Sequence, residues 1–228
     1  MGIGVGQVKV IAIANPAGGV GKTTLAHCLA VAFAEFGKKT LLIDLDSAAQ
    51  LTFRLGYENP RLTITEFISG VKITEENLVT TSERFDFIAS DSRLAANLDE
   101  GVLSQLLLKL PKDYDLVIFD IPSTLTPALG AGISAADQIL VPVSQSLHSL
   151  RGLIQLRKIT NKPITAIGIG EVNYEELTPV LDVAILRSDE VEIAASSDLS
   201  VLTLSKSSEV SESYRSAAYS VLEILGLE

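Results

Sequence analysis

Hydrophobic residues fall into short, nearly continuous runs that alternate with stretches of helical spacing. Continuous apolar runs are typical of strands that are covered on both faces of a sheet, since half-exposed strands alternate apolar and polar residues. The runs cover residues 8–14, 40–46, 85–90, 115–120, 138–143, 164–170, 180–186 and 200–205. Their alternation with helical stretches predicts an α/β fold, with a doubly wound, mostly parallel sheet and helices on both faces.

The segment between the first two runs has the spacing of a helix. Its apolar residues Leu25, Leu29, Phe33 and Phe36 recur every three or four positions. Gly37 follows in the position where helices commonly end. The chain therefore begins with a strand–helix–strand unit.

Two further helices are predicted, over about residues 146–160 and 209–225, each with one apolar face. No internal repeat, low-complexity linker or block of charge divides the chain. We therefore expect a single domain over residues 1–228.

The composition indicates a folded domain and excludes several kinds of cysteine-based site. Hydrophobic residues make up 47% and charged residues 20%, which is typical of a folded soluble domain. Cys28 is the only cysteine, so one chain contains neither a disulfide nor a cysteine-based zinc or iron–sulfur site. No apolar run reaches the ~20 residues of a spanning helix, and the first residues lack the basic segment of a signal peptide. We expect a cytoplasmic protein.

The glycine-rich segment after the first strand has the features of a phosphate-binding loop, because it joins a strand to a helix. Glycines let the backbone approach phosphate oxygens, Lys22 supplies positive charge to the β- and γ-phosphates, and the Thr23 hydroxyl is a ligand for Mg²⁺. The predicted nucleotide-binding residues of this loop are Gly18, Gly19, Val20, Gly21, Lys22, Thr23 and Thr24.

Aspartates end two of the predicted strands. Asp44 and Asp46 close the run at 40–46, and Asp120 closes the run at 115–120. The carboxyl ends of parallel strands meet at one edge of a sheet, so these carboxylates are expected beside the phosphate-binding loop. One of them can hold a magnesium-bound water, and another can position the water that attacks the γ-phosphate.

The base of the nucleotide is constrained by one absent motif. Guanine-selective P-loop proteins pair the base with an Asn-Lys-x-Asp sequence at a strand end. The nearest match is Asn161-Lys162-Pro163-Ile164, which lacks the aspartate. The sequence therefore favours ATP over GTP.

Several segments together resemble the ParA/MinD family of deviant Walker ATPases over essentially the whole chain. They are, in order, GGVGKTT, GKKTLLIDLDSAAQLT, YDLVIFDIPSTLTPALGAGISAADQILVPV, LRGL and VLTLSKSSEVSESYRSAAY. The resemblance implies ATP and Mg²⁺ as cofactors and a sandwich homodimer that forms with ATP. It also implies slow hydrolysis that an adaptor protein stimulates, and the positioning of a cargo over DNA or a membrane.

The resemblance also implies residue roles. Lys22 matches the catalytic phosphate lysine, Asp46 the hydrolysis aspartate and Asp44 its strand neighbour. Thr23 and Asp120 match the magnesium threonine and the Walker B aspartate, so Thr23, Asp120 and Asp46 are the predicted metal site.

The segment Ile185-Leu186-Arg187-Ser188 matches the adenine-contacting loop of the family, although the usual proline is absent. Leu186 and Arg187 are its predicted nucleotide contacts.

Ala17 occupies the position of the family's signature lysine, which reaches across the dimer to the partner's phosphates. Without it, two facing triphosphates in a partly dry interface repel each other. Residues 138–170 contain no aspartate or glutamate but do contain Arg151, which lies close to the carboxyl edge of the sheet. We hypothesise that Arg151 contacts the nucleotide in trans in place of the lysine. The alternative is that Arg151 belongs to a solvated helix face.

Within the family, this chain is similar to McdA-type carboxysome-positioning proteins, because it lacks the signature lysine in this loop. This resemblance implies a nucleoid-associated ATPase that binds double-stranded DNA without sequence preference and distributes carboxysomes through an adaptor. The net charge of −10 requires that basic residues gather locally for such binding, and Arg187, Lys206 and Arg215 with the cluster at 151–162 are the candidates.

Three alternative functions remain for comparison. One is a plasmid or chromosome partition ATPase of the ParA type. Another is a MinD-like membrane switch, which the segment SVLEILGLE disfavours because it contains no basic residue. A reductase of the nitrogenase iron-protein type shares the loop, but a single cysteine argues against it. His27 is expected to be a packing or surface residue, and Cys28 a small buried one.

Overall fold

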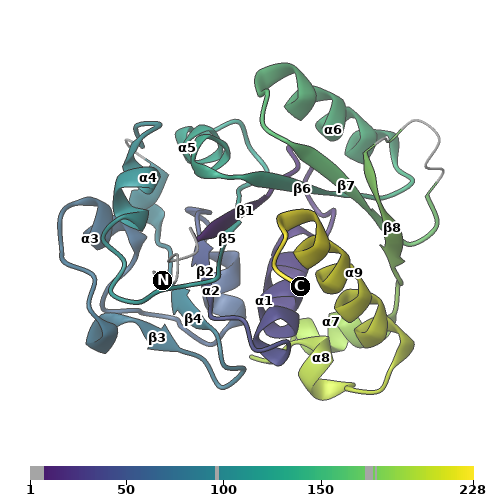
Figure 1. Ribbon diagram of the computed structural model, residues 1–228, viewed down its shortest axis with the longest axis horizontal. Helices are drawn as coiled ribbons and strands as arrows, with labels where there is room; N and C mark the ends of the chain where they lie inside the picture. The colour runs from purple at the N-terminus through teal and green to yellow at the C-terminus, as the bar shows by residue number, and fades with distance from the viewer. Residues whose placement is uncertain (1–7, 96–97, 173–176, 178) are drawn as a thin grey trace, which may run out of the picture.

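An eight-stranded sheet forms the centre of the protein (Figure 1). The computed structural model describes residues 8–95, 98–172, 177 and 179–228. In spatial order, the strands are β3 (Val79–Thr80), β4 (Asp86–Ile88), β2 (Thr40–Asp44), β5 (Leu116–Asp120), β1 (Lys9–Ile13), β6 (Gln138–Val143), β7 (Ile164–Ile169) and β8 (Val180–Ile185). Among the described residues, all neighbouring strands run parallel except β3 and β4, which confirms the predicted fold class.

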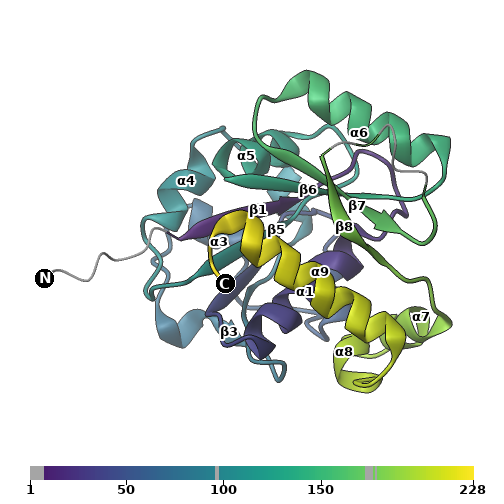
Figure 2. The same cartoon turned by 45° about the vertical axis from the view of Figure 1, so that its right-hand side comes forward.

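Helices cover both faces of the sheet (Figures 1 and 2). One layer contains α1 (Lys22–Glu35), α2 (Gln50–Arg54), α7 (Asp189–Ala195), α8 (Val201–Leu204) and α9 (Glu209–Leu225). The other layer contains α3 (Ile64–Ile68), α4 (Val102–Leu107), α5 (Pro127–Ala135) and α6 (Leu147–Ile159). Short 3₁₀ helices lie at Glu75–Asn77 and Ser92–Ala95. Successive strand residues point into alternate layers, which explains why the strands are apolar throughout.

The three predicted helices are confirmed with small shifts of their ends. The first is α1, and Gly37 beyond its end has φ +78°, a conformation that favours glycine. The second is α6, and the third is α9, which ends at Gly226 with φ +67°.

The strand predicted at residues 200–205 is wrong, because this segment forms α8. The backbone N–H and the hydroxyl of Ser200 both donate to Glu83 Oε1, at 3.0 and 2.6 Å, and this contact fixes the start of the helix. Val201 and Leu202 then pack into the helical layer that contains α1 and α9, and they do not form an edge strand. The short strand β3 was not predicted, since two residues carry no readable period.

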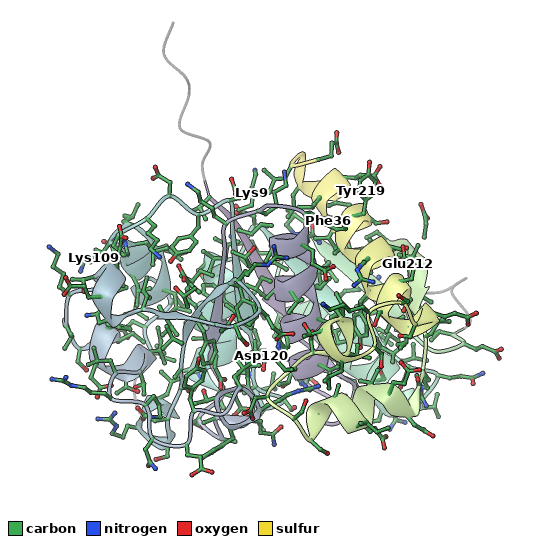
Figure 3. All side chains as sticks on the ribbon, turned by 90° about the horizontal axis from the view of Figure 1, so that it is seen from below. Lys9, Phe36, Lys109, Asp120, Glu212 and Tyr219 are labelled. Atoms are coloured by element: carbon green, nitrogen blue, oxygen red, sulfur yellow. The ribbon has the colours of Figure 1, made fainter. Side chains whose placement is uncertain are left out.

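The strand order reverses at β1. The chain passes from β1 to one side of the sheet to form β2, and β6 lies against the opposite side of β1. Ligands of open α/β sheets bind at such a point, at the carboxyl ends of the strands. Figure 3 shows Lys9, at the start of β1, and Asp120, at the end of β5, at opposite edges of the sheet.

Candidate functional site

The loop between β1 and α1 is built to leave backbone N–H groups free. Gly19 and Gly21 have φ +70° and +88°, which side-chain-bearing residues rarely adopt. Gly21 is the N-cap of α1, and no side chain of the described residues caps the first turn. The unpaired N–H groups and the positive end of the helix dipole therefore form an anion-binding site.

Lys22 is folded back onto this loop. Its side chain is buried, and Nζ donates to the carbonyl oxygen of Ala17 at 2.9 Å and to Ser123 Oγ at 2.7 Å. Burial lowers the pKa of Lys22, while the negative charges of Asp120 and Asp46 oppose that shift. Ser123 was not predicted, although its place three residues after Asp120 put it beside the same strand end.

The strand-end aspartates lie together, as the parallel register requires. Asp44 is paired with Asp120 across β2 and β5. Burial raises the pKa of Asp44 to about 6, against hydrogen bonds from the N–H of Asp46 and from the N–H and hydroxyl of Thr52. Both carboxylate oxygens of Asp44 accept these bonds, so Asp44 holds the loop that follows β2.

The surroundings of Asp120 suit a cation ligand. Burial raises its pKa well above the usual value, and the charge of Asp44 raises it further, while Thr23 and Lys22 oppose the shift. Its Oδ1 atom is buried and has no hydrogen-bond partner among the described residues. A carboxylate beside a threonine hydroxyl fits Mg²⁺, which prefers oxygen ligands.

Thr23 and Asp120 do not complete the coordination of Mg²⁺, so further ligands are needed. Among the described residues, no group of three or more His, Cys, Asp or Glu side chains is arranged to hold a metal. Asp46 is half-buried, and its carboxylate accepts a hydrogen bond from the N–H of Ala48 at 2.9 Å. Since Mg²⁺ commonly keeps waters and binds substrate phosphates, Thr23, Asp120 and Asp46 fit a site that a nucleotide completes.

Two cavities meet at the P-loop. The phosphate-side cavity, of about 420 Å³, contains Lys22, Thr23, Asp46, Arg54 and Ser123. The nucleoside-side cavity, of about 370 Å³, is lined by Ser144, Ile169, Leu186, Arg187 and Tyr214 among others. Gly19, Val20, Gly21 and Thr24 line both cavities. The predicted loop residues and the predicted adenine loop are thus adjacent.

The predicted adenine loop contacts α9 and the end of β7. The N–H of Leu186 donates to Ser213 Oγ of α9 at 3.2 Å. Arg187 lies over Gly170, where an added Cβ would be 3.0 Å from Arg187 Nε. A third cavity, of about 420 Å³ between α3 and α4, contains none of the predicted site residues.

The start of α6 covers the P-loop at Ala17. Asn15 is fully buried, accepts the N–H of Ala17 at 2.9 Å and donates to the carbonyl oxygens of Pro142 and Ser149. An added Cβ on Gly152 would lie 1.9 Å from Asn15 Oδ1 and 3.3 Å from the nitrogen of Ala17. Ala17 itself is buried. Asn15 and Gly152 were not predicted as site residues.

Arg151 therefore lies next to Gly152, one of the residues of α6 that contact the loop. Its side chain is exposed, and it makes no ion pair within the part of the chain that the structure describes. It lines neither cavity of its own subunit. Of the other basic candidates, Arg215 is paired with Glu35, with Nε 2.7 Å from Oε2.

A cluster of buried polar side chains connects α1 with α8 through Glu83. His27 Nε2 is 2.5 Å from Glu83 Oε2, and Glu83 also accepts hydrogen bonds from Ser200 and Thr203. Burial alone raises the pKa of Glu83, but these partners lower it to about 2. His27 is thus a buried packing residue with a partner that was not predicted. Cys28 is buried as expected, and burial raises its pKa to about 12.

Comparison with known sequences gives one family and a set of curated relatives. Residues 8–167 match the model of an AAA domain. Over 182 residues, the chain is 34% identical to the chromosome-partitioning ATPase Soj of Thermus thermophilus, covering 75% of this chain and 72% of that protein. It is 31% identical over 161 residues to the sporulation initiation inhibitor protein Soj of Bacillus subtilis. That match covers 65% of this chain and 63% of the relative's length.

Solved structures share the fold over nearly the whole chain. The ATP complex of an aspartate-to-alanine variant of Cyanothece McdA superposes with a TM-score of 0.80 at 25% identity, covering 97% of both chains. Cobyrinic acid a,c-diamide synthase of Mycobacterium smegmatis, with a bound ATP analogue and magnesium, gives a TM-score of 0.76 at 26% identity, covering 96% of both chains.

Within the described residues, no helix has both the length and the hydropathy to span a bilayer.

Proposed function

Because this chain belongs to the ParA/MinD family of P-loop ATPases, we propose that it binds Mg·ATP and hydrolyses it slowly. The observation that carries the proposal is the phosphate-side cavity. There, the start of α1, the buried Lys22 and the carboxylate of Asp46 surround one space, and Asp120, a buried carboxylate with an unpaired oxygen among the described residues, lies beside Thr23 and Lys22 of its wall. Such a space is complementary to a triphosphate with its metal ion.

The proposal assigns roles to charged and hydroxyl side chains in this cavity and beside it. Lys22 exchanges its contacts with Ala17 and Ser123 for β- and γ-phosphate oxygens. Thr23 and Asp120, together with Asp46, would hold Mg²⁺, which would neutralise charge on the phosphates. Asp46 orients the attacking water. Asp44 positions Asp46 through the hydrogen bond from the N–H of Asp46 at 2.9 Å.

The nucleoside-side cavity receives the base and ribose, with Leu186 and Arg187 at its wall. The bound ATP of the McdA structure and the ATP analogue of the diamide synthase support adenine as the base. Calorimetric titration with ATP, GTP and adenosine tests this assignment. Absence of binding heat with Mg·ATP would refute the proposed function as a whole.

We further propose that ATP joins two copies into a sandwich homodimer, with Arg151 of each copy contacting the partner's nucleotide. Two observations support this. Ala17 is buried under α6, so the P-loop itself offers no cation at that point. Arg151 is exposed and adjacent to Gly152, which touches the loop. A guanidinium binds phosphate oxygens through a planar set of donors.

Light scattering tests the role of Arg151. With ATP and the hydrolysis-deficient Asp46→Ala background, the parent protein is expected to be a dimer and the Arg151→Ala protein a monomer. Lys158→Ala, on the same helix, is the matched control and is expected to dimerise. An Arg151→Ala protein that dimerises like its parent contradicts the proposal.

The function that these parts support is the positioning of a cargo. We propose that the dimer binds double-stranded DNA without sequence preference and that an adaptor protein stimulates hydrolysis. The likeness to McdA supports carboxysomes as the cargo, and the chromosome-partitioning Soj of Thermus thermophilus supports a chromosome as the alternative. Filter binding should show ATP-dependent retention of DNA that falls steeply as salt rises. Liposome co-sedimentation without DNA binding would favour a membrane switch.

A further inference from the structure

Arg54, the last residue of α2, lies beside the first turn of the P-loop helix. Its Nη1 atom donates to Thr24 Oγ1 at 2.7 Å. It also lines the phosphate-side cavity together with Lys22 and Asp46. A second cation of the same subunit is therefore present where the nucleotide phosphates are expected.

The guanidinium of Arg54 is incompletely bonded. Its Nε and Nη2 atoms are shielded from solvent and have no acceptor among the described residues. No carboxylate of the described chain forms an ion pair with Arg54, whereas Arg93 and Arg215 are both paired with acidic side chains. Shielded N–H groups of a charged side chain cost stability unless an acceptor is available. An anionic ligand would supply that acceptor.

The position of Thr24 indicates which phosphate is concerned. Lys22 and Thr23 line only the phosphate-side cavity, whereas Thr24 lines both cavities. In a nucleotide that occupies both, the group at their junction is the α-phosphate, since it joins the ribose to the rest of the phosphate chain. Arg54 is bonded to the side chain at this junction.

We propose that Arg54 is a nucleotide-binding residue that donates to the α-phosphate in its own subunit. The inference rests on the proposed binding of Mg·ATP. It assigns to Arg54 a contact distinct from that of Lys22 with the β- and γ-phosphates and from that of Arg151 with the partner's nucleotide. Because ATP and ADP share the α-phosphate, Arg54 retains the nucleotide through hydrolysis.

Calorimetric titration of the full chain with adenosine, AMP, ADP and ATP tests the proposal. Arg54→Ala is expected to weaken AMP, ADP and ATP by one common factor, about 10- to 100-fold, because each ligand loses the same charge-assisted hydrogen bonds. Adenosine binding is expected to be unchanged. Arg54→Lys, which keeps the charge without the planar fork, is expected to lie between the two. Arg93→Ala removes a paired arginine elsewhere and serves as the control.

Each other pattern overturns the proposal in a recognisable way. A loss confined to ATP would place Arg54 at the γ-phosphate, and an equal loss for adenosine would mean that it only shapes the cavity. Unchanged affinities in a folded Arg54→Ala protein would mean that it only holds Thr24. If the parent protein binds none of the ligands, the proposed function fails as well, so the two failures are distinguishable.

A second measurement does not require the alanine variant to be stable. ADP with sulfur in place of one α-phosphate oxygen is a poorer hydrogen-bond acceptor at that phosphate alone. The parent protein is expected to bind this analogue more weakly than ADP, and Arg54→Lys is expected to lose most of that discrimination. Equal discrimination by both proteins would contradict a contact between Arg54 and the α-phosphate.

Discussion

The two cavities at the P-loop share four residues but differ in what forms their walls. The phosphate-side cavity is lined by Lys22, whose pKa burial lowers, and by Asp46, and the buried carboxylates of Asp120 and Asp44 lie beside these residues. The nucleoside-side cavity is lined by Ile169 of β7, by the segment that follows β8, by α7 and by the buried Tyr214 of α9, and its charged side chains, Arg187, Asp189 and Glu192, are exposed. The N–H of Leu186 in that segment is held by Ser213 of α9. Changes on the first side should therefore act through phosphate charge and chemistry, and changes on the second through loop order.

The largest expected effect is on hydrolysis. Asp46→Ala is expected to lower kcat by about 10²- to 10⁴-fold, the usual contribution of a group that directs proton transfer. ATP affinity should be nearly unchanged, so the ATP-bound dimer should accumulate. Steady-state phosphate release and light scattering measure the two quantities. Turnover equal to that of the parent would remove Asp46 from the proposed chemistry.

Lys22→Ala is expected to have the next largest effect, on affinity. Loss of a buried cation with several phosphate contacts should weaken ADP and ATP by about 100-fold or more. Adenosine, which has no phosphate, should bind as before. Titration of all three ligands checks this. A similar loss for adenosine would show that the two cavities are not separable, and Ser123→Ala provides a milder change at the same lysine.

This contrast also explains how far the sequence predicts the site. Lys22, Thr23, Asp46 and Asp120 lie within one motif or at strand ends, and parallel pairing brings strand ends together whatever the rest of the chain does. Arg54, Asn15 and Ser123 were missed, because each functions through contacts that only packing creates.

The same limit applies to the fold. Apolar runs predicted seven of the eight strands, but the run at 200–205 is a helix. Burial of Ser200 against Glu83, 117 residues away, decides that outcome, and no local pattern records it.

Glu83 connects the start of α8 to His27 of α1, and its ionisation predicts a pH dependence of stability. The folded-state pKa of Glu83 is about 2, below its usual value of 4.5, so ionised Glu83 stabilises the fold above about pH 4.5. That contribution, about 3 kcal/mol, should be lost as the pH falls from about 4.5 towards about 2.

Urea unfolding at several pH values tests this dependence. Glu83→Gln is expected to be less stable than the parent protein at pH 6 and to approach it near pH 2.5, since a neutral side chain cannot titrate. His27→Gln, which removes the partner, should reduce the same slope. Parallel stability curves for parent and Glu83→Gln would contradict the assignment.

The smallest effect is expected from Ser213→Ala, and it separates the two cavities most sharply. The change removes the acceptor for the N–H of Leu186 and should cost about 1 kcal/mol, or about fivefold in affinity. Because the loop contacts the base end of the ligand, the loss should be equal for adenosine, ADP and ATP, the opposite of the Lys22→Ala pattern. Ser220→Ala, two turns along α9, is the control. A loss that grew with the number of phosphates would mean that α9 affects binding of the phosphate chain, and the division between a phosphate side and a nucleoside side would fail.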